Sequence, residues 1–231
     1  MINFYTMRCL FCESTLKNNE HILCAYCEQS CHLPEKLESH YCATCSNTLS
    51  KADSVCGRCL SNSPPWNLLV CFSDYQGSLK WLIKQFKYQN KLYLAPLLSR
   101  FLYSKIKTLD NNDRPDAIVP MPSHWTRHWH RGFNQSYIIA KFLSRATVIP
   151  LISQGVKRSR RTPALEGLKR KQRRAVVSNA FSVSVPLPNH VAIVDDVFTT
   201  GSSAESLAKI LIRHGVQRVD LWVLARTPEK R

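Results

Sequence analysis

Two carboxylates and a hydroxyl-rich loop follow one another closely near the C-terminal end of the chain. Asp195 and Asp196 come directly after the apolar run 191–194. The loop beyond them consists of hydroxyl residues around a single glycine: Thr199, Thr200, Gly201, Ser202 and Ser203. Backbone N–H groups of such a loop, at the start of a helix, bind phosphate, and carboxylates accept hydrogen bonds from sugar hydroxyls. The stretch therefore predicts a site for a ribose 5-phosphate group.

The elements on either side of this stretch must hold it in place. A continuous run of small and β-branched apolar residues at 191–194 is typical of a strand buried on both faces of a parallel sheet. Ser202 and Glu205 fit a capping box, so we expect a helix to begin at Ser202. Gly215 suits the end of that helix. The predicted order is strand, loop and helix, with the carboxylates at the end of the strand.

Other parts of the chain predict further strands and helices of an α/β fold. Strands are expected at 68–72, 116–119, 180–185 and 218–224, and helices at 78–88 and 92–106. The strand at 116–119 is followed by a rigid turn: Pro120, Met121, Pro122 and Ser123. Ligands of parallel sheets bind at the carboxyl ends of the strands, so we expect this turn to face the same crevice as the carboxylates. Lys80, Lys84 and Lys87 are interpreted as a solvated helix face, the alternative being that Lys87 and Tyr88 lie near the phosphate site.

Eight cysteines form four C-x2-C pairs within the first 63 residues. They are Cys9, Cys12, Cys24, Cys27, Cys42, Cys45, Cys56 and Cys59. Because two such pairs complete a tetrahedron of thiolates, the spacing predicts two zinc ribbons whose closed sites make the metal structural. Whether consecutive pairs share a metal, or the pairs interleave, stays open. A disulfide framework would need an oxidising compartment, and Cys31 and Cys71 are expected to be buried thiols.

Composition divides the chain into two unequal parts. We place a boundary at the Pro-rich stretch 61–66, with a double zinc-ribbon module at 1–63 and the α/β domain at 64–231. The net charge is +16, yet residues 1–63 hold five Lys and Arg against six Asp and Glu. The larger domain therefore carries the whole basic excess, which favours polyanionic partners such as nucleic acid.

The chain shows no signal for membrane insertion or export. Its apolar runs are shorter than the ~18 residues that a spanning helix needs, and the first residues do not form a secretory signal. We therefore expect a cytoplasmic protein that is at most peripheral to the inner membrane.

Cations alternate with aromatic residues just after the proline turn. This segment contains Trp125, Arg127, Trp129, Arg131 and Asn134. The two tryptophans are candidates for stacking on the bases of single-stranded DNA, although core burial is the commoner fate of tryptophan. Arg131 and Asn134 are candidate anion contacts, against the simpler alternatives of a surface arginine and a helix N-cap.

The string from Asp195 to Ser203 resembles the phosphoribosyl-pyrophosphate (PRPP) motif of type I phosphoribosyltransferases. Together with the P-x-P turn and R-G-F-N-Q at 131–135, it resembles the ComF family of late competence proteins over nearly the whole chain. This resemblance implies a phosphoribosyltransferase-like sheet flanked by helices. It also implies that the acidic pair holds the ribose hydroxyls and is catalytic in an active enzyme, that the loop 199–203 holds the 5-phosphate, and that the turn 120–123 holds pyrophosphate.

A basic arm, residues 155–179, lies where these transferases carry a flexible lid. Its nine cations stand against one Glu166 and are Lys157, Arg158, Arg160, Arg161, Lys169, Arg170, Lys171, Arg173 and Arg174. Such a charge run can bind the phosphates of a polyanion, or it can simply be solvated. Leu165 and Val176 depart from the family pattern of Gln and Asn, which weakens the case for a catalytically competent lid.

Three functions are consistent with these features. The first is a competence protein that handles incoming single-stranded DNA and has a pocket for PRPP or a ribose-5-phosphate group. The second is an active, Mg²⁺-dependent phosphoribosyltransferase acting on an unidentified nucleophile. The third is a zinc-ribbon adaptor with a relict pocket, which binds the DNA-uptake machinery or a helicase.

Overall fold

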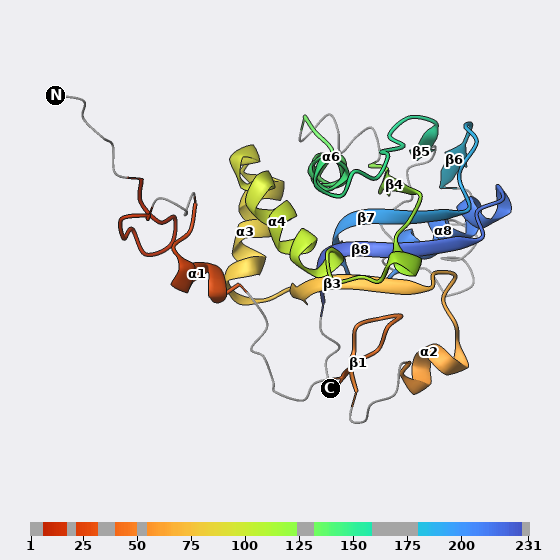
Figure 1. The fold of residues 1–231 in the computed structure, drawn as a ribbon, viewed down its shortest axis with the longest axis horizontal. Coiled ribbons are helices and arrows are strands. Elements are labelled where there is room, and N and C mark those ends of the chain that lie inside the picture. The colour runs from red at the N-terminus through yellow and green to blue at the C-terminus, as the bar shows by residue number, and fades with distance from the viewer. Residues whose placement is uncertain are drawn as a thin grey trace, which may run out of the picture.

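A four-stranded parallel sheet forms the centre of the computed structural model, which describes residues 7–17, 22–31, 40–49, 55–123, 132–158 and 180–227 (Figure 1). In spatial order, its strands are β3 (Leu68–Asp74), β8 (Arg218–Arg226), β7 (His190–Phe198) and β4 (Ala117–Pro120). Every neighbouring pair is parallel. The predicted α/β architecture is confirmed.

Helices cover both faces of this sheet. Successive strand residues point to opposite sides, so Val194 packs towards α4 (Ala95–Ile106) and α6 (Gln135–Thr147), whereas Ile193 packs towards α8 (Ser202–Arg213). Burial on two sides explains why these strands are continuously apolar in sequence. Each fully buried Val, Leu or Ile contributes about 1.5–3 kcal/mol relative to an exposed one.

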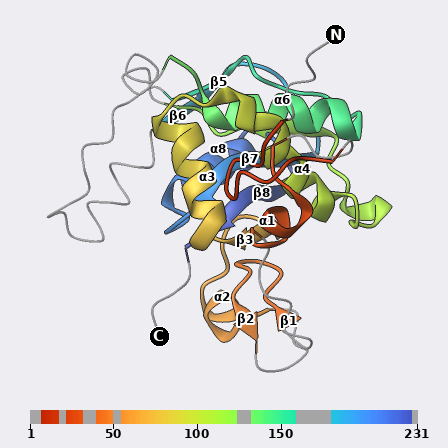
Figure 2. The ribbon, with the colours of Figure 1, turned by 90° about the vertical axis from the view of Figure 1, so that its left-hand side faces the viewer.

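Helix α3 (Gly77–Tyr88) stands at the carboxyl ends of the strands (Figures 1 and 2). Its buried residues recur at helical spacing, as predicted: Leu79, Leu82, Ile83 and Phe86. The 3-10 turn η1 (Leu92–Leu94) and α4 together replace the single helix predicted at 92–106. Pro96 lies in the first turn of α4, where its missing N–H leaves no hydrogen bond unmade. A second 3-10 turn, η2 (Asn111–Asp113), precedes β4.

Helix α8 begins at Ser202 as predicted, but the predicted capping box is wrong. Gly201 is the N-cap residue, with a φ of 75°, and no side chain caps the helix. Glu205 pairs with Lys209 one turn further on. Gly215 follows the end of the helix with a φ of 96°, as expected for a helix stop. The box fails because Ser202 already lies inside the first turn.

A small antiparallel pair lies outside the main sheet. It consists of β5 (Val156–Arg158) and β6 (Phe181–Val183), and β6 confirms the centre of the strand predicted at 180–185. The basic arm was expected to be a loop from residue 155, and its first residues instead form β5. Residues 159–179 of the arm lie outside the described residues.

The described residues of the N-terminal quarter form only short elements. These are α1 (Ala25–Gln29), β1 (His40–Tyr41), β2 (Thr48–Leu49) and α2 (Gly57–Ser61). The first cysteine segment (described residues between 7 and 31) shares a core cluster with α3 and α4, to which Leu23 and Cys27 belong. The second cysteine segment (described residues between 40 and 59) meets strand β3, where the Leu69 N–H donates to the Ala43 carbonyl over 2.7 Å. Figure 1 shows the two segments at different places around the sheet.

Helices in the described part of the chain are all too short or too polar to cross a bilayer.

Candidate functional site

The acidic pair lies inside strand β7, because the strand continues to Phe198 rather than ending at the carboxylates. Asp195 Oδ1 accepts hydrogen bonds from the Ser136 hydroxyl, over 2.8 Å, and from the Asp196 N–H, over 2.9 Å. Ser136 belongs to the first turn of α6, so this helix start is attached directly to the acidic pair. The carboxylates are therefore held by neighbouring elements and do not project freely from a loop.

Asp196 is buried, with 5% of its surface exposed, and forms an ion pair with Lys87. Lys87 Nζ lies 2.6 Å from Asp196 Oδ2, while the Val197 N–H donates to Oδ1 over 2.8 Å. Our preferred interpretation of Lys87 as part of a solvated helix face was wrong, because Lys87 lies against the acidic pair. The alternative, that Lys87 and Tyr88 lie near a phosphate, stays a prediction. A signal was present, because Lys87 lies one helical turn after the buried Ile83.

Burial and charge shift the proton affinities in this group. Burial, with the neighbouring charge of Asp196, raises the pKa of Asp195 from 3.8 to about 6, although the hydrogen bond from Ser136 opposes the shift. Burial alone would lower the pKa of Lys87, but the carboxylate of Asp196 outweighs it and raises the pKa overall. Lys87 is therefore a stable cation beside two carboxylates at neutral pH.

The predicted phosphate loop starts where β7 ends and leads directly into α8. Thr199 and Thr200 are exposed, and the Thr200 hydroxyl lies 2.9 Å from the Ser202 hydroxyl. Gly201 is buried against two aromatic rings: a Cβ at this position would lie 3.0 Å from Phe198 and 3.1 Å from Trp66. The positive φ and this close contact both require glycine here. The loop therefore presents its hydroxyls and the N-terminus of α8 outwards, while its back rests on the rings.

Trp66 connects this loop to the second cysteine segment. Its ring meets Phe198 edge-on, with 5.7 Å between ring centroids. The Trp66 indole N–H donates to the Thr44 carbonyl over 2.7 Å, and Thr44 lies between Cys42 and Cys45. The loop thus depends on a tryptophan that the cysteine segment holds in place.

The proline turn was predicted from Pro120, but Pro120 is the buried last residue of β4 and pairs with Val194 of β7, so the turn begins at Met121. The Met121 N–H donates to the Val194 carbonyl over 2.8 Å, which places the turn next to the acidic pair. Met121 and Pro122 are buried, and Ser123 is partly exposed. A ligand at this turn could therefore contact its backbone and Ser123.

Asn134 is the N-cap of helix α6, which was the simpler alternative to its predicted role as an anion contact. It caps α6 by accepting from the Tyr137 N–H over 3.3 Å, and its side-chain amide donates to the Met121 carbonyl over 3.1 Å. Asn134 thereby joins α6 to the proline turn, and Gln135 donates to the Lys87 carbonyl over 3.4 Å. The start of α6 holds the turn, the acidic pair and α3 together.

Several predicted contacts lie outside the described residues. They are Trp125, Arg127, Trp129 and Arg131, and the arm residues Arg160, Arg161, Lys169, Arg170, Lys171, Arg173 and Arg174. The two arm cations that are described lie on β5: Lys157 is exposed, and the Arg158 guanidinium lies 5.3 Å from the centre of the Phe181 ring. Their role in nucleic-acid binding stays a prediction.

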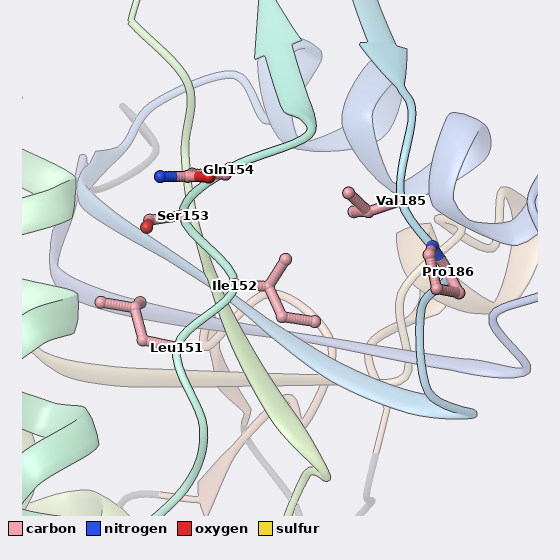
Figure 3. A pocket seen from close by; sticks show the side chains of 6 residues that line it. All are labelled: Leu151, Ile152, Ser153, Gln154, Val185 and Pro186. Carbon is pink, nitrogen blue, oxygen red and sulfur yellow. The ribbon is translucent and has the colours of Figure 1, made fainter.

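A hollow of about 370 Å³ lies elsewhere, between the segment that follows α6 and the segment that follows β6 (Figure 3). Its lining residues carry no charge and are Leu151, Ile152, Ser153, Gln154, Val185 and Pro186. Ile152 and Val185 point into it from opposite sides (Figure 3). None of the predicted site residues lines this hollow, and it lacks the charged groups that bind a phosphorylated ligand.

The eight paired cysteines form two compact groups. Consecutive pairs come together, Cys9 and Cys12 with Cys24 and Cys27, and Cys42 and Cys45 with Cys56 and Cys59. Within each group all sulfur atoms lie within 4.8 Å of one another. This arrangement excludes the interleaved pairing.

Sulfur spacing in both groups fits a tetrahedral metal. The Cys12 and Cys24 sulfurs are 3.6 Å apart, and those of Cys45 and Cys56 are 3.7 Å apart. Four thiolates at about 2.3 Å from zinc would be separated by about 3.8 Å. The described cysteines form no disulfide. Cys31 is buried as predicted, with burial raising the pKa of its thiol to about 12, whereas Cys71, also predicted to be buried, is partly exposed on β3. Both groups could therefore hold zinc in closed, structural sites.

Known proteins match the chain along nearly its whole length. Competence protein F of Haemophilus influenzae is 35% identical over 234 residues, which cover 98% of this chain and 100% of that protein. DNA utilization protein YhgH of Escherichia coli K12 is 34% identical over 223 residues, covering 95% of this chain and 96% of that protein. Competence protein ComFC of Streptococcus pneumoniae is 24% identical over 234 residues, covering 95% and 100%. No family model matches the chain.

Gly201→Ala should lower the free energy of unfolding by about 2–4 kcal/mol, because the new Cβ adds backbone strain and collides with the Trp66 and Phe198 rings. Gly215→Ala is the matched control, since Gly215 has a φ of 96° but nothing within 4 Å of an added Cβ. It should cost only about 1–2 kcal/mol. Urea unfolding measures both. Equal losses would show that the rings do not confine the loop.

Asp195→Asn should stabilise the protein at neutral pH. The native pKa of about 6 lies above the ordinary 3.8, so the native state binds this proton more tightly than the unfolded state. The contribution of Asp195 to the free energy of unfolding is therefore fully present below pH 4 and is lost as the pH rises through 6. The substitution should therefore raise the free energy of unfolding by up to about 3 kcal/mol at pH 7.5, and by progressively less towards pH 4. The exposed Asp110→Asn serves as control, and a gain that does not vary with pH would contradict the assignment.

Purified protein should contain two zinc ions per chain. Cys12→Ser and Cys56→Ser should each reduce the content to about one, because each removes a ligand from a different group. Cys71→Ser should keep both ions, since Cys71 belongs to neither group. Elemental analysis by mass spectrometry measures the content. Loss of both ions from either single-ligand variant would show that the two sites are not independent.

Proposed function

Because this chain belongs to the ComF family of competence proteins, we propose that it handles incoming single-stranded DNA during natural transformation. Two relatives are named as competence proteins, and the name of another refers to DNA utilization. The basic excess of residues 64–231 supports the same partner, since neutralising DNA phosphates releases counterions and favours binding.

The proposal includes a pocket that holds a ribose 5-phosphate group, from PRPP or from a nucleotide. The observation that carries it is the placement of Asp195, Asp196 and Lys87 together at the carboxyl end of β7, with the loop of Gly201 following at once. Carboxyl ends of parallel strands are where α/β folds bind ligands. A phosphate fits the N-terminus of α8, where backbone N–H groups are free of helical partners.

In this pocket the acidic pair would accept hydrogen bonds from the ribose hydroxyls. Asp195 retains Oδ2 for this role, because Oδ1 is engaged with Ser136 and the Asp196 N–H. Lys87 lies at the boundary with solvent, its side chain 21% exposed, so its ammonium can be shared between Asp196 and an incoming phosphate oxygen. Mg²⁺ prefers carboxylate and phosphate oxygens, and the acidic pair supplies the first kind.

PRPP binding tests the pocket directly. Isothermal titration of the zinc-loaded protein with PRPP should show saturable binding, and Thr200→Val should weaken it about tenfold by removing one hydroxyl from the loop. Thr48→Val, on an exposed residue of β2, should leave the affinity unchanged. Titrations with and without Mg²⁺ show whether the cation contributes. Absence of binding by the wild type under both conditions would refute the pocket but leave DNA handling to be judged on its own.

Active phosphoribosyl transfer is the second candidate, and the intact acidic pair beside Lys87 favours it. In such an enzyme Asp195 and Asp196 would stabilise positive charge that develops on the ribose as pyrophosphate departs. Leu165 and Val176 in the basic arm, where the family pattern has Gln and Asn, argue against an active transferase. Release of pyrophosphate from PRPP in the presence of candidate bases or amines would establish this activity. If neither PRPP nor single-stranded DNA is bound, an adaptor that binds the uptake machinery becomes the better explanation.

A further inference from the structure

Helix α3 and the turn η1 that follows it expose several large aromatic side chains. Five large aromatic residues are exposed in the described part of the chain, and three of them lie within residues 81–93. These three are Trp81, Tyr88 and Tyr93, which are 38%, 56% and 53% exposed. Single exposed apolar residues are common on protein surfaces, but a group of them in one region often marks a binding site.

The helical repeat arranges these side chains in order. Trp81 and Tyr88 are seven residues apart, so they lie on one stripe of the outward face. Lys80, Lys84 and Lys87 follow an i, i+4, i+7 spacing and form a second stripe beside it. Two adjacent stripes of residues result, one aromatic and one of lysines, and the last lysine, Lys87, turns its ammonium to Asp196.

The stretch of sequence around this helix is basic and contains no acidic residue. Residues 75–109 contain seven Lys and Arg and no Asp or Glu. Arg100 is paired with Glu28 over 2.7 Å, and Lys87 is paired with Asp196. Lys80 and Lys84 are exposed on α3, and Lys91 is partly exposed after it.

Neighbouring groups hold the Trp81 ring in a fixed position. The Phe11 ring meets it edge-on at 5.1 Å, and Phe11 lies between Cys9 and Cys12 of the first cysteine segment. Lys91 Nζ lies 5.7 Å from the centre of the Trp81 ring. A ring that is already fixed loses little conformational freedom on binding. Figure 2 shows the first cysteine segment beside α3.

We propose that this outward face of α3 is a binding surface for single-stranded DNA, in which Trp81 and Tyr88 stack on bases and the lysine row follows the phosphates. This inference rests on the proposed function and names the place on the molecule where the DNA is held. Alternating aromatic and cationic groups bind single strands with little sequence preference, since every base has a face to stack. A duplex keeps its bases stacked inside and cannot use the rings.

The surface also leads to the candidate pocket. Lys87 ends the lysine row and is itself the partner of Asp196. A strand lying along α3 would therefore bring one end of its backbone towards the ribose-phosphate site. Lys87 therefore belongs to both the proposed DNA surface and the proposed pocket.

Fluorescence anisotropy with fluorescein-labelled dT20 and the full-length, zinc-loaded protein tests the surface. Trp81→Ala combined with Tyr88→Ala should raise the Kd at least tenfold. Tyr88→Ala alone should raise it about fivefold. Tyr41→Ala is the matched control, because Tyr41 is 43% exposed but lies on β1, and its Kd should stay within twofold of wild type. A 20-base-pair duplex should bind at least tenfold more weakly than dT20.

Two further variants separate stacking and charge from folding. Trp81→Phe keeps an aromatic ring and should stay within about threefold of wild type. Lys80→Gln combined with Lys84→Gln should reduce the slope of log Kd against log salt by about 1.4, at roughly 0.7 per phosphate contact. Lys141→Gln, on an exposed residue of α6, should leave that slope unchanged. Zinc content and thermal melting confirm that each variant is folded.

The outcomes distinguish failure of the surface from failure of the proposed function. If wild type binds dT20 and Tyr88→Ala and the double aromatic variant bind it equally tightly, the surface on α3 is refuted while DNA handling stands. Equal binding of duplex and single strand would also refute stacking. If wild type has no measurable affinity for dT20 at 50 mM salt, the proposed DNA handling fails, and the surface with it.

Discussion

The ion pair between Lys87 and Asp196 is the interaction on which the arrangement of the site depends. Its atoms lie 2.6 Å apart, and only 7% of the Asp196 side chain is exposed. A buried carboxylate costs several kcal/mol unless a cation accompanies it, and Asp195 adds a second acidic group next to it. Lys87 must therefore reach the carboxyl end of β7, and α3, which carries it, must stand across the strand ends. The same helix then turns Trp81 and Tyr88 outwards. One electrostatic requirement thus orients both the proposed pocket and the proposed surface beside it.

Each cysteine group supports a different part of this arrangement. The second segment holds Trp66 through the Thr44 carbonyl, and Trp66 in turn confines Gly201 in the predicted phosphate loop. The first segment places Phe11 against Trp81 on α3. Segments this short bury too few apolar side chains to fix their own shape, whereas four thiolates around a metal can do so. Closed, structural metal sites are consistent with this supporting role. Residues 1–63 carry five Lys and Arg against six Asp and Glu and so have no basic excess, which is why the proposed DNA contact is assigned to the larger domain.

Much of the fold could be predicted from the sequence, because its signals are local. Continuous apolar runs indicated the strands of a parallel sheet, and β3, β4, β7 and β8 confirm them. The C-x2-C spacing identified the eight cysteines that come together, and helical periodicity identified the buried face of α3. Boundaries were less accurate: β7 extends past the acidic pair, and Gly201 rather than Ser202 caps α8. Both errors arose because the end of a strand and the cap of a helix depend on which neighbouring groups provide hydrogen bonds. Those neighbours cannot be identified from the sequence.

By itself, the sequence determined the residue types of the candidate site. Its carboxylates, hydroxyls and glycine are close together in the chain, so they can be recognised without a structure. Only the tertiary structure decided their partners. Lys87 meets Asp196 across more than a hundred residues, Ser136 reaches Asp195, and Asn134 serves as a cap and a link to Met121. Periodicity shows that a side chain faces inwards or outwards, but not what lies opposite it. That depends on how helices and strands from distant parts of the chain pack, which is why the sequence alone assigned Lys87 to solvent.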